Sequence, residues 1–248
     1  MSRAALVLAL VLAAPAHAAA FSATRAGLTV WPARTRIAAG QTATMHVANG
    51  SGRVQVLTLS VAGFALDLRG DPRVVRASAG TRLLRVRPAT LVVAPHAAAW
   101  FTVRALPAAA APGDHPALVL LTARSGGGAG IGVRLRIGVS IEVRVPGMVR
   151  HRLELVAARL RMRRLVDVVV ENRGNVSERI GRGALVARVW LRHRLVVTLA
   201  PRPRELLPRT RGVVEFALPR RLHGRLTIVA AAPRGRGRGR ARRLSVTV

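Results

Sequence analysis

The chain has 248 residues, of which 50% are hydrophobic, so it can bury one large or two ordinary cores and is not a disordered protein. It carries 41 basic residues, all of them arginine, against 10 acidic ones, a formal net charge of +31. That charge attracts polyanions such as anionic wall polymers, acidic lipids or nucleic acid. The absence of cysteine excludes disulfides and thiolate metal sites.

Residues 1–20 have the features of a secretory signal peptide. Ser2 and Arg3 precede an apolar run from Ala4 to Ala13, and small-x-small patterns follow around Ala18. The alternative is an uncleaved anchor, but the run is shorter than the roughly 20 residues that a spanning helix needs. We therefore expect cleavage, a mature chain without a transmembrane segment, and a secreted protein associated with the cell envelope.

The mature chain alternates apolar and polar residues in short runs, which is typical of all-β proteins. Turn sequences separate these runs at Asn49-Gly50, at Pro112-Gly113-Asp114 and at Gly126-Gly127-Gly128. The pattern predicts strands at Leu28–Ile37, Thr42–Val47, Leu83–Arg87, Ala117–Thr122, Val133–Ile137 and Ile141–Val145. In the strands with alternating arginines, one face is expected in the core and the arginines in solvent.

The same order of elements starts again after Pro146-Gly147. Predicted strands at Leu153–Arg161 and Val166–Val170 lead to a second turn at residues 172–175, as the first strands lead to Asn49-Gly50. This weak repeat predicts two immunoglobulin-like β-sandwich domains, at residues 21–147 and 148–248.

The second domain contains an Arg/Gly-rich segment at residues 233–243. It is either a disordered arm or a long hairpin loop. Strand-like residues flank it at Ile228–Ala231 and Leu244–Val248, which favours the loop. We assign it no specific nucleic acid partner.

Residues for catalysis are few and scattered, with ten carboxylates and seven histidines in the chain. Asp67, Asp71 and Asp114 are the carboxylates whose proximity matters, and a solvated turn paired with arginines is favoured over a calcium site. The formal glycosylation sequons at Asn49 and Asn175 are interpreted as turns. We predict no enzyme activity, no catalytic residues, no cofactor and no metal.

Several segments resemble the WxL-interacting surface proteins of Gram-positive bacteria. The resemblance covers most of the mature chain and lies in Trp100–Val103, in Pro112–His115 with Leu118–Thr122, in Val143–Gly147 and in the turn at residues 172–175. It implies a peptidoglycan-binding first domain and a second domain that contacts another surface protein. The membrane helix that usually ends members of that family is absent from this sequence.

A second resemblance is to PapD-like periplasmic pilus chaperones. It lies in Thr35-Arg36-Ile37, in Val47-Ala48-Asn49 and in Leu135 to Val145. In that family a cleft arginine and lysine hold the terminal carboxylate of the pilin. Arg36 matches the arginine, whereas Glu142 falls at the lysine position and would repel a carboxylate.

Two functions follow as expectations, and neither comes with assigned ligand-binding residues. The first is an exported cell-envelope scaffold that contacts anionic wall polymer or peptidoglycan and a surface-protein partner. The alternative is a secreted assembly chaperone that lends a β-strand to its client. The net charge does not distinguish these two functions, because the codon bias of a GC-rich genome also produces a composition rich in arginine and alanine.

Overall fold

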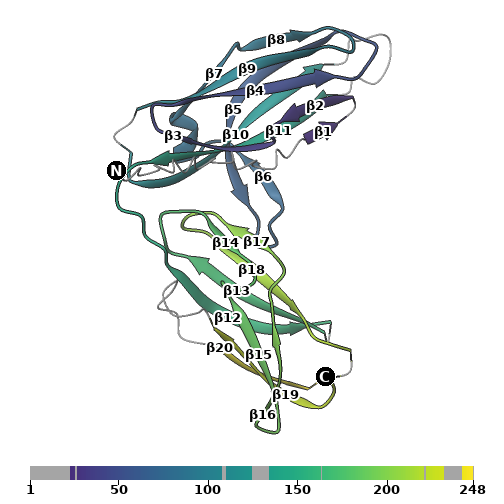
Figure 1. The fold of residues 1–248 in the computed structure, drawn as a ribbon, viewed down its shortest axis with the longest axis vertical. Helices are drawn as coiled ribbons and strands as arrows, with labels where there is room; N and C mark the ends of the chain where they lie inside the picture. The colour runs from purple at the N-terminus through teal and green to yellow at the C-terminus, as the bar shows by residue number, and fades with distance from the viewer. Residues whose placement is uncertain are drawn as a thin grey trace, which may run out of the picture.

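The structure is a computed structural model that describes residues 23–25, 27–107, 110–124, 134–162, 164–220, 222–231 and 242–247. The predicted signal peptide and the glycine turn at 126–128 lie outside these ranges, as does most of the Arg/Gly-rich segment. Strands β1 to β11 form one lobe and β12 to β20 the other (Figure 1). The lobes are two immunoglobulin-like β-sandwich domains with separate cores, one between Leu28 and Val145 and one between Leu153 and Ala230.

Two sheets face each other in the first domain. One has the order β1-β2-β4-β9-β7, and the other has the order β3-β11-β10-β5-β6, with β8 paired to β5. The strands are β1 (Ala23–Arg25), β2 (Leu28–Trp31), β3 (Arg34–Ala38), β4 (Thr42–Asn49), β5 (Gln55–Leu66), β6 (Pro72–Val75), β7 (Leu84–Arg87), β8 (Thr90–Val93), β9 (Ala98–Ala105), β10 (Gly113–Arg124) and β11 (Arg134–Val145). A short helix, α1 (Ala79–Arg82), precedes β7.

The second domain has three smaller sheets, with orders β12-β13-β18, β14-β17 and β16-β15-β19-β20. Its strands are β12 (Leu153–Arg161), β13 (Leu165–Asn172), β14 (Glu178–Ile180), β15 (Val186–Leu191), β16 (Arg194–Leu199), β17 (Arg204–Leu206), β18 (Arg211–Ala217), β19 (Arg225–Ala231) and β20 (Arg242–Thr247). Strand β20 pairs antiparallel with β19. Arg242 and Arg243, at the end of the Arg/Gly-rich segment, belong to β20; the rest of that segment lies outside the described residues, and its interpretation as a hairpin loop stays a prediction.

Alternation of side chains explains the cores. In β10, Ala117, Val119 and Leu121 are buried in the main core of the first domain, whereas Leu118 and Leu120 point to the opposite face and form a small cluster with Ala62. A strand with apolar residues at successive positions is expected to have cover on both faces. The outer face of β10 is covered beside Ala62 and Phe64 of β5, and the short helix α1 contacts both strands, which accounts for this composition.

Three predicted boundaries are wrong. Leu28–Ile37 forms two strands in different sheets, since Pro32, between β2 and β3, has no N–H to donate to a ladder. The predicted strands Val133–Ile137 and Ile141–Val145 are not separate: their described residues, 134–137 and 141–145, belong to one continuous strand, β11. Asp114 lies inside β10 and not in a turn, because the ladder with β11 extends to Gly113 opposite Val145.

Candidate functional site

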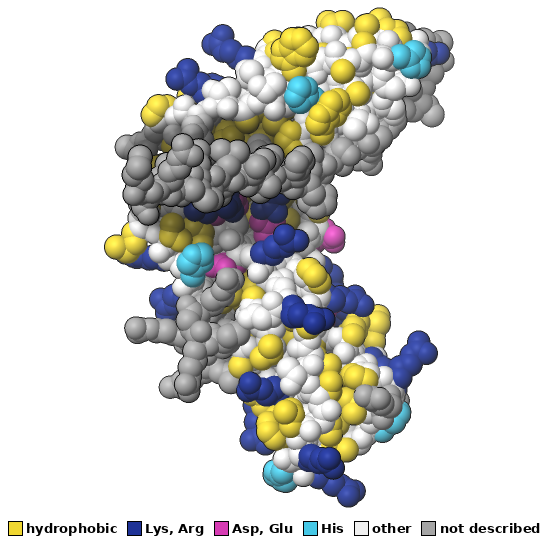
Figure 2. Space-filling view, in the orientation of Figure 1, with side chains coloured by type: hydrophobic (Ala, Val, Ile, Leu, Met, Phe, Trp, Pro, Cys, Tyr) yellow, Lys and Arg dark blue, Asp and Glu magenta, His cyan; other side chains and the backbone are white. Residues whose placement is uncertain are grey.

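The waist between the two domains concentrates opposite charges. Figure 2 shows acidic side chains there, beside basic ones. Strand β3 supplies Arg34 and Arg36, β11 supplies Glu142 and Arg144, and β10 supplies Asp114. In the parallel register of β3 with β11, Arg36 lies opposite Glu142, and in the β10–β11 register Asp114 lies opposite Arg144. Neighbouring strands thus place the five side chains together.

These side chains form a connected set of ion pairs. Arg36 Nη2 lies 2.5 Å from Glu142 Oε1 and 3.7 Å from Asp114 Oδ2, while Arg144 Nη2 lies 3.0 Å from Asp114 Oδ2. The side chain of Asp114 is fully buried and that of Glu142 is 3% exposed. The hydrogen bond from Arg144 to Asp114 raises the pKa of this arginine. The arginines thus supply partners for both buried carboxylates, as buried acidic groups require.

The second domain completes this cluster. Glu205 of β17 pairs with Arg34, and this hydrogen bond raises the arginine's pKa. The backbone N–H of Ser177 donates to Asp114 Oδ2 over 2.8 Å, and the hydroxyl of Ser177 donates to Glu142. This waist cluster therefore contains three arginines and three carboxylates, of which Glu205 alone comes from the second domain, and its formal charge is zero.

Asn175 ties the domains together beside the cluster. Its backbone oxygen accepts the N–H of Asp114 over 2.8 Å. Its side-chain amide donates to the carbonyls of Pro112 and Met148, each over 2.8 Å. Gly113 has φ +128, and a Cβ there would lie 2.1 Å from the Asn175 carbonyl oxygen. Only glycine permits this approach of the two backbones.

The loop from Asp67 to Asp71 makes a second contact between the domains. The carbonyl of Leu68 accepts the N–H of Val213 over 2.7 Å, and the carbonyl of Asp67 accepts Arg204 Nη2 over 2.9 Å. Asp67 Oδ1 accepts the N–H groups of Arg69, Gly70 and Asp71. These contacts lower the pKa of Asp67 to about 2, chiefly through the Asp71 N–H. Burial lowers the pKa of Arg204.

The three aspartates singled out from the sequence do not converge. Asp67 and Asp71 share a loop and Asp67 pairs with Arg73, whereas Asp114 belongs to the waist cluster. In the described part of the chain, no group of three or more His, Cys, Asp or Glu side chains could hold a metal ion. The same residues contain no helix of the length and apolarity required to cross a membrane.

The edge of β11 is the other candidate feature. Strand β3 pairs with residues Ser140 to Arg144, and no described strand is hydrogen-bonded to residues 134–139 on that side, although β1, which pairs with β2, lies close to β11. The N–H of Ser140 donates to the carbonyl of Ala33, so it points away from β10. Because strand residues alternate, the N–H and C=O groups of Gly138 and Arg136 point to the same open side. The unpaired N–H and C=O groups of this edge can form backbone hydrogen bonds with another strand.

Sequence reasoning identified Arg36 and Glu142, and the structure places them in contact. It missed Arg34, Arg144 and Glu205. Arg34 and Arg36 alternate along β3, which is a local signal that both lie on one face. Glu205 comes from the other domain, and no pattern in the sequence indicates which arginine it meets.

Comparison with known proteins gives structural likeness alone. No family model and no curated protein matches the chain. One similar solved structure is a chaperone-tip adhesin complex vital for activation of CFA/I fimbriae biogenesis, with 13% identity, a TM-score of 0.50, and coverage of 90% of this chain and 100% of that one. A second is the class 5 fimbriae chaperone CfaA, with 12% identity, a TM-score of 0.49, and coverage of 89% of this chain and 99% of that one. A third is the Salmonella enterica SafB chaperone in complex with SafA pilin, with 13% identity, a TM-score of 0.48, and coverage of 91% of this chain and 99% of that one.

The first of these likenesses shows the fold. The PapD-like two-domain architecture expected from the second sequence resemblance is confirmed. The resemblance to the WxL-interacting proteins receives no support from the comparisons.

Proposed function

We propose that this protein is an exported binding protein of the cell envelope that captures an extended segment of a partner protein along the open edge of β11. The observation that carries the proposal is the length of β11, which extends six residues beyond the part that β3 covers. Addition of a strand to an exposed edge is a common mode of peptide recognition. The similar structures include chaperones in complex with a tip adhesin or a pilin, which supports a surface-protein partner.

The waist cluster distinguishes this protein from a chaperone that grips a terminal carboxylate. Arg36, the residue at the expected anchoring position, is already paired with Glu142 and lies near Asp114. A partner's carboxylate would have to displace two carboxylates that are almost completely buried, and it would meet their repulsion. Affinity is therefore expected from backbone hydrogen bonds along the edge, without an anchor at the partner's C-terminus.

A proline substitution at the edge tests the proposal. Arg136→Pro removes an N–H that points to the open side, and proline is tolerated on the solvent side of an edge strand. Arg136→Ser is the matched control, because it removes the same charge and keeps the N–H. The probe is a library of extended peptides with alternating apolar and polar residues, titrated against the folded mature chain.

We expect the serine variant to bind the selected peptides as the wild type does and the proline variant to lose binding at least tenfold. Equal binding by both variants, with unchanged circular dichroism, would contradict capture at this edge. Peptides that compete with each other but bind equally to wild type and proline variant would place the binding surface elsewhere.

A further inference from the structure

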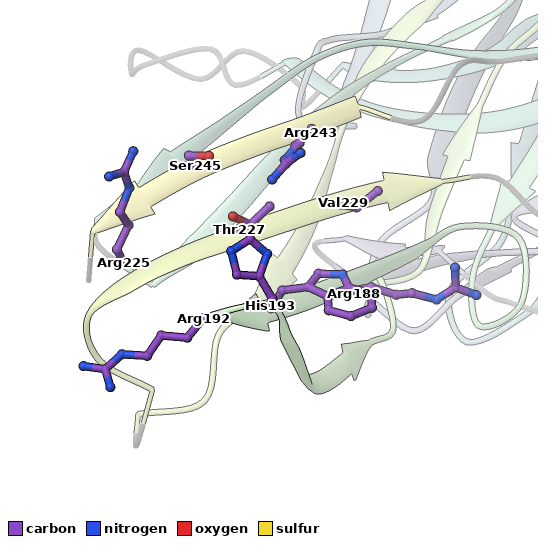
Figure 3. Close-up of a pocket in the computed structure, with 9 residues that line it drawn as sticks. Arg188, Arg192, His193, Arg225, Thr227, Val229, Arg243 and Ser245 are labelled. Carbon is purple, nitrogen blue, oxygen red and sulfur yellow. The ribbon is translucent and has the colours of Figure 1, made fainter.

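The outer face of the sheet β16-β15-β19-β20 is hollowed in the second domain. Its inner face packs Ala187, Val189 and Ile228 into the core, so Arg188, Trp190 and their neighbours on alternate positions face outward. The hollow has a volume of about 640 Å³. It is lined by Arg188, Trp190, Arg192, His193, Arg225, Thr227, Val229, Arg243 and Ser245 (Figure 3).

The register of the strands orders these residues in two rows. Val229 lies opposite Arg188 on one side and Arg243 on the other, which forms a row with an arginine at each end. Thr227 lies between Trp190 and Ser245 in the next row, which has an aromatic ring at one end and two hydroxyls beside it. The arginines at the ends of the first row are about 10 Å apart at the backbone, two strand spacings.

The charge of this face is uncompensated. Its four arginines, Arg188, Arg192, Arg225 and Arg243, are exposed. Every acidic residue except Asp71 is ion-paired to other basic side chains, and Asp71 lies on the loop of the first domain. No described carboxylate lines the hollow. This arrangement is the opposite of the waist, where each arginine has a carboxylate partner.

The chemistry of the lining selects the class of ligand. Arginines that lack a partner bind carboxylate or phosphate groups through charge-assisted hydrogen bonds. Trp190 is half-buried, so it presents part of an apolar ring to the hollow. Thr227 and Ser245 offer neutral donors and acceptors of the kind that sugar hydroxyls require. Single-stranded nucleic acid favours several aromatic residues in succession, and Trp190 is the one tryptophan among the lining residues.

We infer that this face binds an acidic polysaccharide, with a sugar ring against Trp190 and the anionic groups on Arg188 and Arg243. Figure 3 shows Arg243 directed toward the middle of the sheet face and Arg188 and Arg225 directed to opposite ends, so contacts to more than one repeat of a polymer are available. The inference goes beyond the proposed function, because the waist and the edge of β11 belong to other strands, and either can fail without the other.

The test measures binding of the full mature chain to two acidic polymers that contain sugar rings: polygalacturonate, which carries carboxylates, and a teichoic acid with glycosyl residues in its repeat, which carries phosphates. Dextran is the neutral control and oligothymidylate the nucleic acid control. Trp190→Ala and the double variant Arg188→Ser/Arg243→Ser alter the site. The matched controls are Trp100→Ala, at an exposed tryptophan of the first domain, and Arg182→Ser/Arg220→Ser, which removes the same charge from exposed positions of the second domain.

We expect both site variants to weaken binding of an acidic polymer roughly tenfold or more, as lost charge-assisted hydrogen bonds and ring contacts predict. The control variants should stay within about twofold, and added salt should weaken binding. Tighter binding of polygalacturonate or of teichoic acid identifies carboxylate or phosphate as the recognised group. Equal losses in site and control variants would reduce the effect to net charge and overturn the inference.

Two further outcomes would also overturn it. The first is dextran binding with the same affinity as the acidic polymers. The second is oligothymidylate binding more tightly than both polymers with the same dependence on Trp190. Trp190→Phe keeps an aromatic ring and should retain most of the affinity. It therefore distinguishes loss of the ring contact from a folding defect in Trp190→Ala.

Discussion

Asn49 and Asn172 make the same hydrogen bonds in the two domains. Each side-chain amide donates to the carbonyl four residues ahead, Arg53 or Val176, and to two consecutive carbonyls of a distant segment, residues 93 and 94 or 206 and 207. Each Oδ1 accepts the N–H two residues ahead. Both asparagines are almost fully buried. Each domain thus has a buried asparagine that hydrogen-bonds a distant segment to the end of an equivalent strand, β4 or β13.

Removal of either asparagine side chain should destabilise the domain that contains it. Asn49→Ala leaves buried carbonyls without a donor, which we expect to cost about 2–4 kcal/mol in unfolding free energy. Asn172→Ala should do the same in the second domain. Urea unfolding followed by hydrogen exchange would assign each loss to its domain. Gln55→Ala is the control, since this amide donates only a 3.3 Å bond to the Ser51 hydroxyl; a loss as large as that of Asn49→Ala would contradict the assignment.

Gly113→Ala should separate the two domains. The added Cβ would lie 2.1 Å from the carbonyl oxygen of Asn175, and φ at this position is +128. Gly40→Ala is the matched control, because Gly40 has φ +88 with no atom within 4 Å of the added Cβ. We expect Gly40→Ala to cost about 1 kcal/mol from backbone strain alone. Gly113→Ala should cost more and should increase the radius of gyration in small-angle X-ray scattering; identical scattering from both variants would argue against this contact.

The loop contact at Asp67 predicts a dependence on acid. Its folded pKa is lowered from 3.8 to about 2, so the contribution to stability is fully present above pH 3.8 and is lost as the pH falls through about 2. Asp67→Asn cannot titrate. The difference in unfolding midpoint between wild type and this variant should therefore be constant above pH 4 and should shrink toward pH 2. A difference that is independent of pH would show that the ionised carboxylate does not hold the loop.

The neutral waist predicts indifference to a partner's terminal charge. The same peptide prepared with a free carboxylate and with a C-terminal amide should bind with affinities within about twofold, because Arg36 is already paired. Isothermal titration of the two peptides is the measurement. A tenfold preference for the free acid would show that Arg36 releases Glu142 to bind it. Arg36→Ser should then abolish that preference, and in our account it changes stability alone.

Much of the fold was predictable from local pattern. Alternation placed β4, β7, β12 and β13 within two residues of their observed ends, since one face of each strand is buried. The repeat of strand, strand and Asn-containing turn was also visible in the sequence. Its physical basis was not, because the hydrogen bonds of Asn49 and Asn172 reach carbonyls that lie 34 to 45 residues away.

The candidate sites were less predictable for the same reason. Some partners of Arg34 and Asp114 belong to the second domain, and contacts between domains produce no periodic pattern of residues in the sequence. The hollow at Trp190 combines β15, β19 and β20, and its rows depend on strand register. Arginine is so frequent in this chain that composition alone does not separate paired from unpaired arginines.

Amide hydrogen exchange at the edge of β11 tests the central claim most directly. In the free protein, the N–H groups of Arg136 and Gly138 should exchange rapidly, whereas that of Val139, which points toward β10, should be protected. Addition of a bound strand peptide should protect Arg136 and Gly138 selectively. Protection of these two amides in the free protein, or no change when the peptide binds, would contradict capture of a partner strand at this edge.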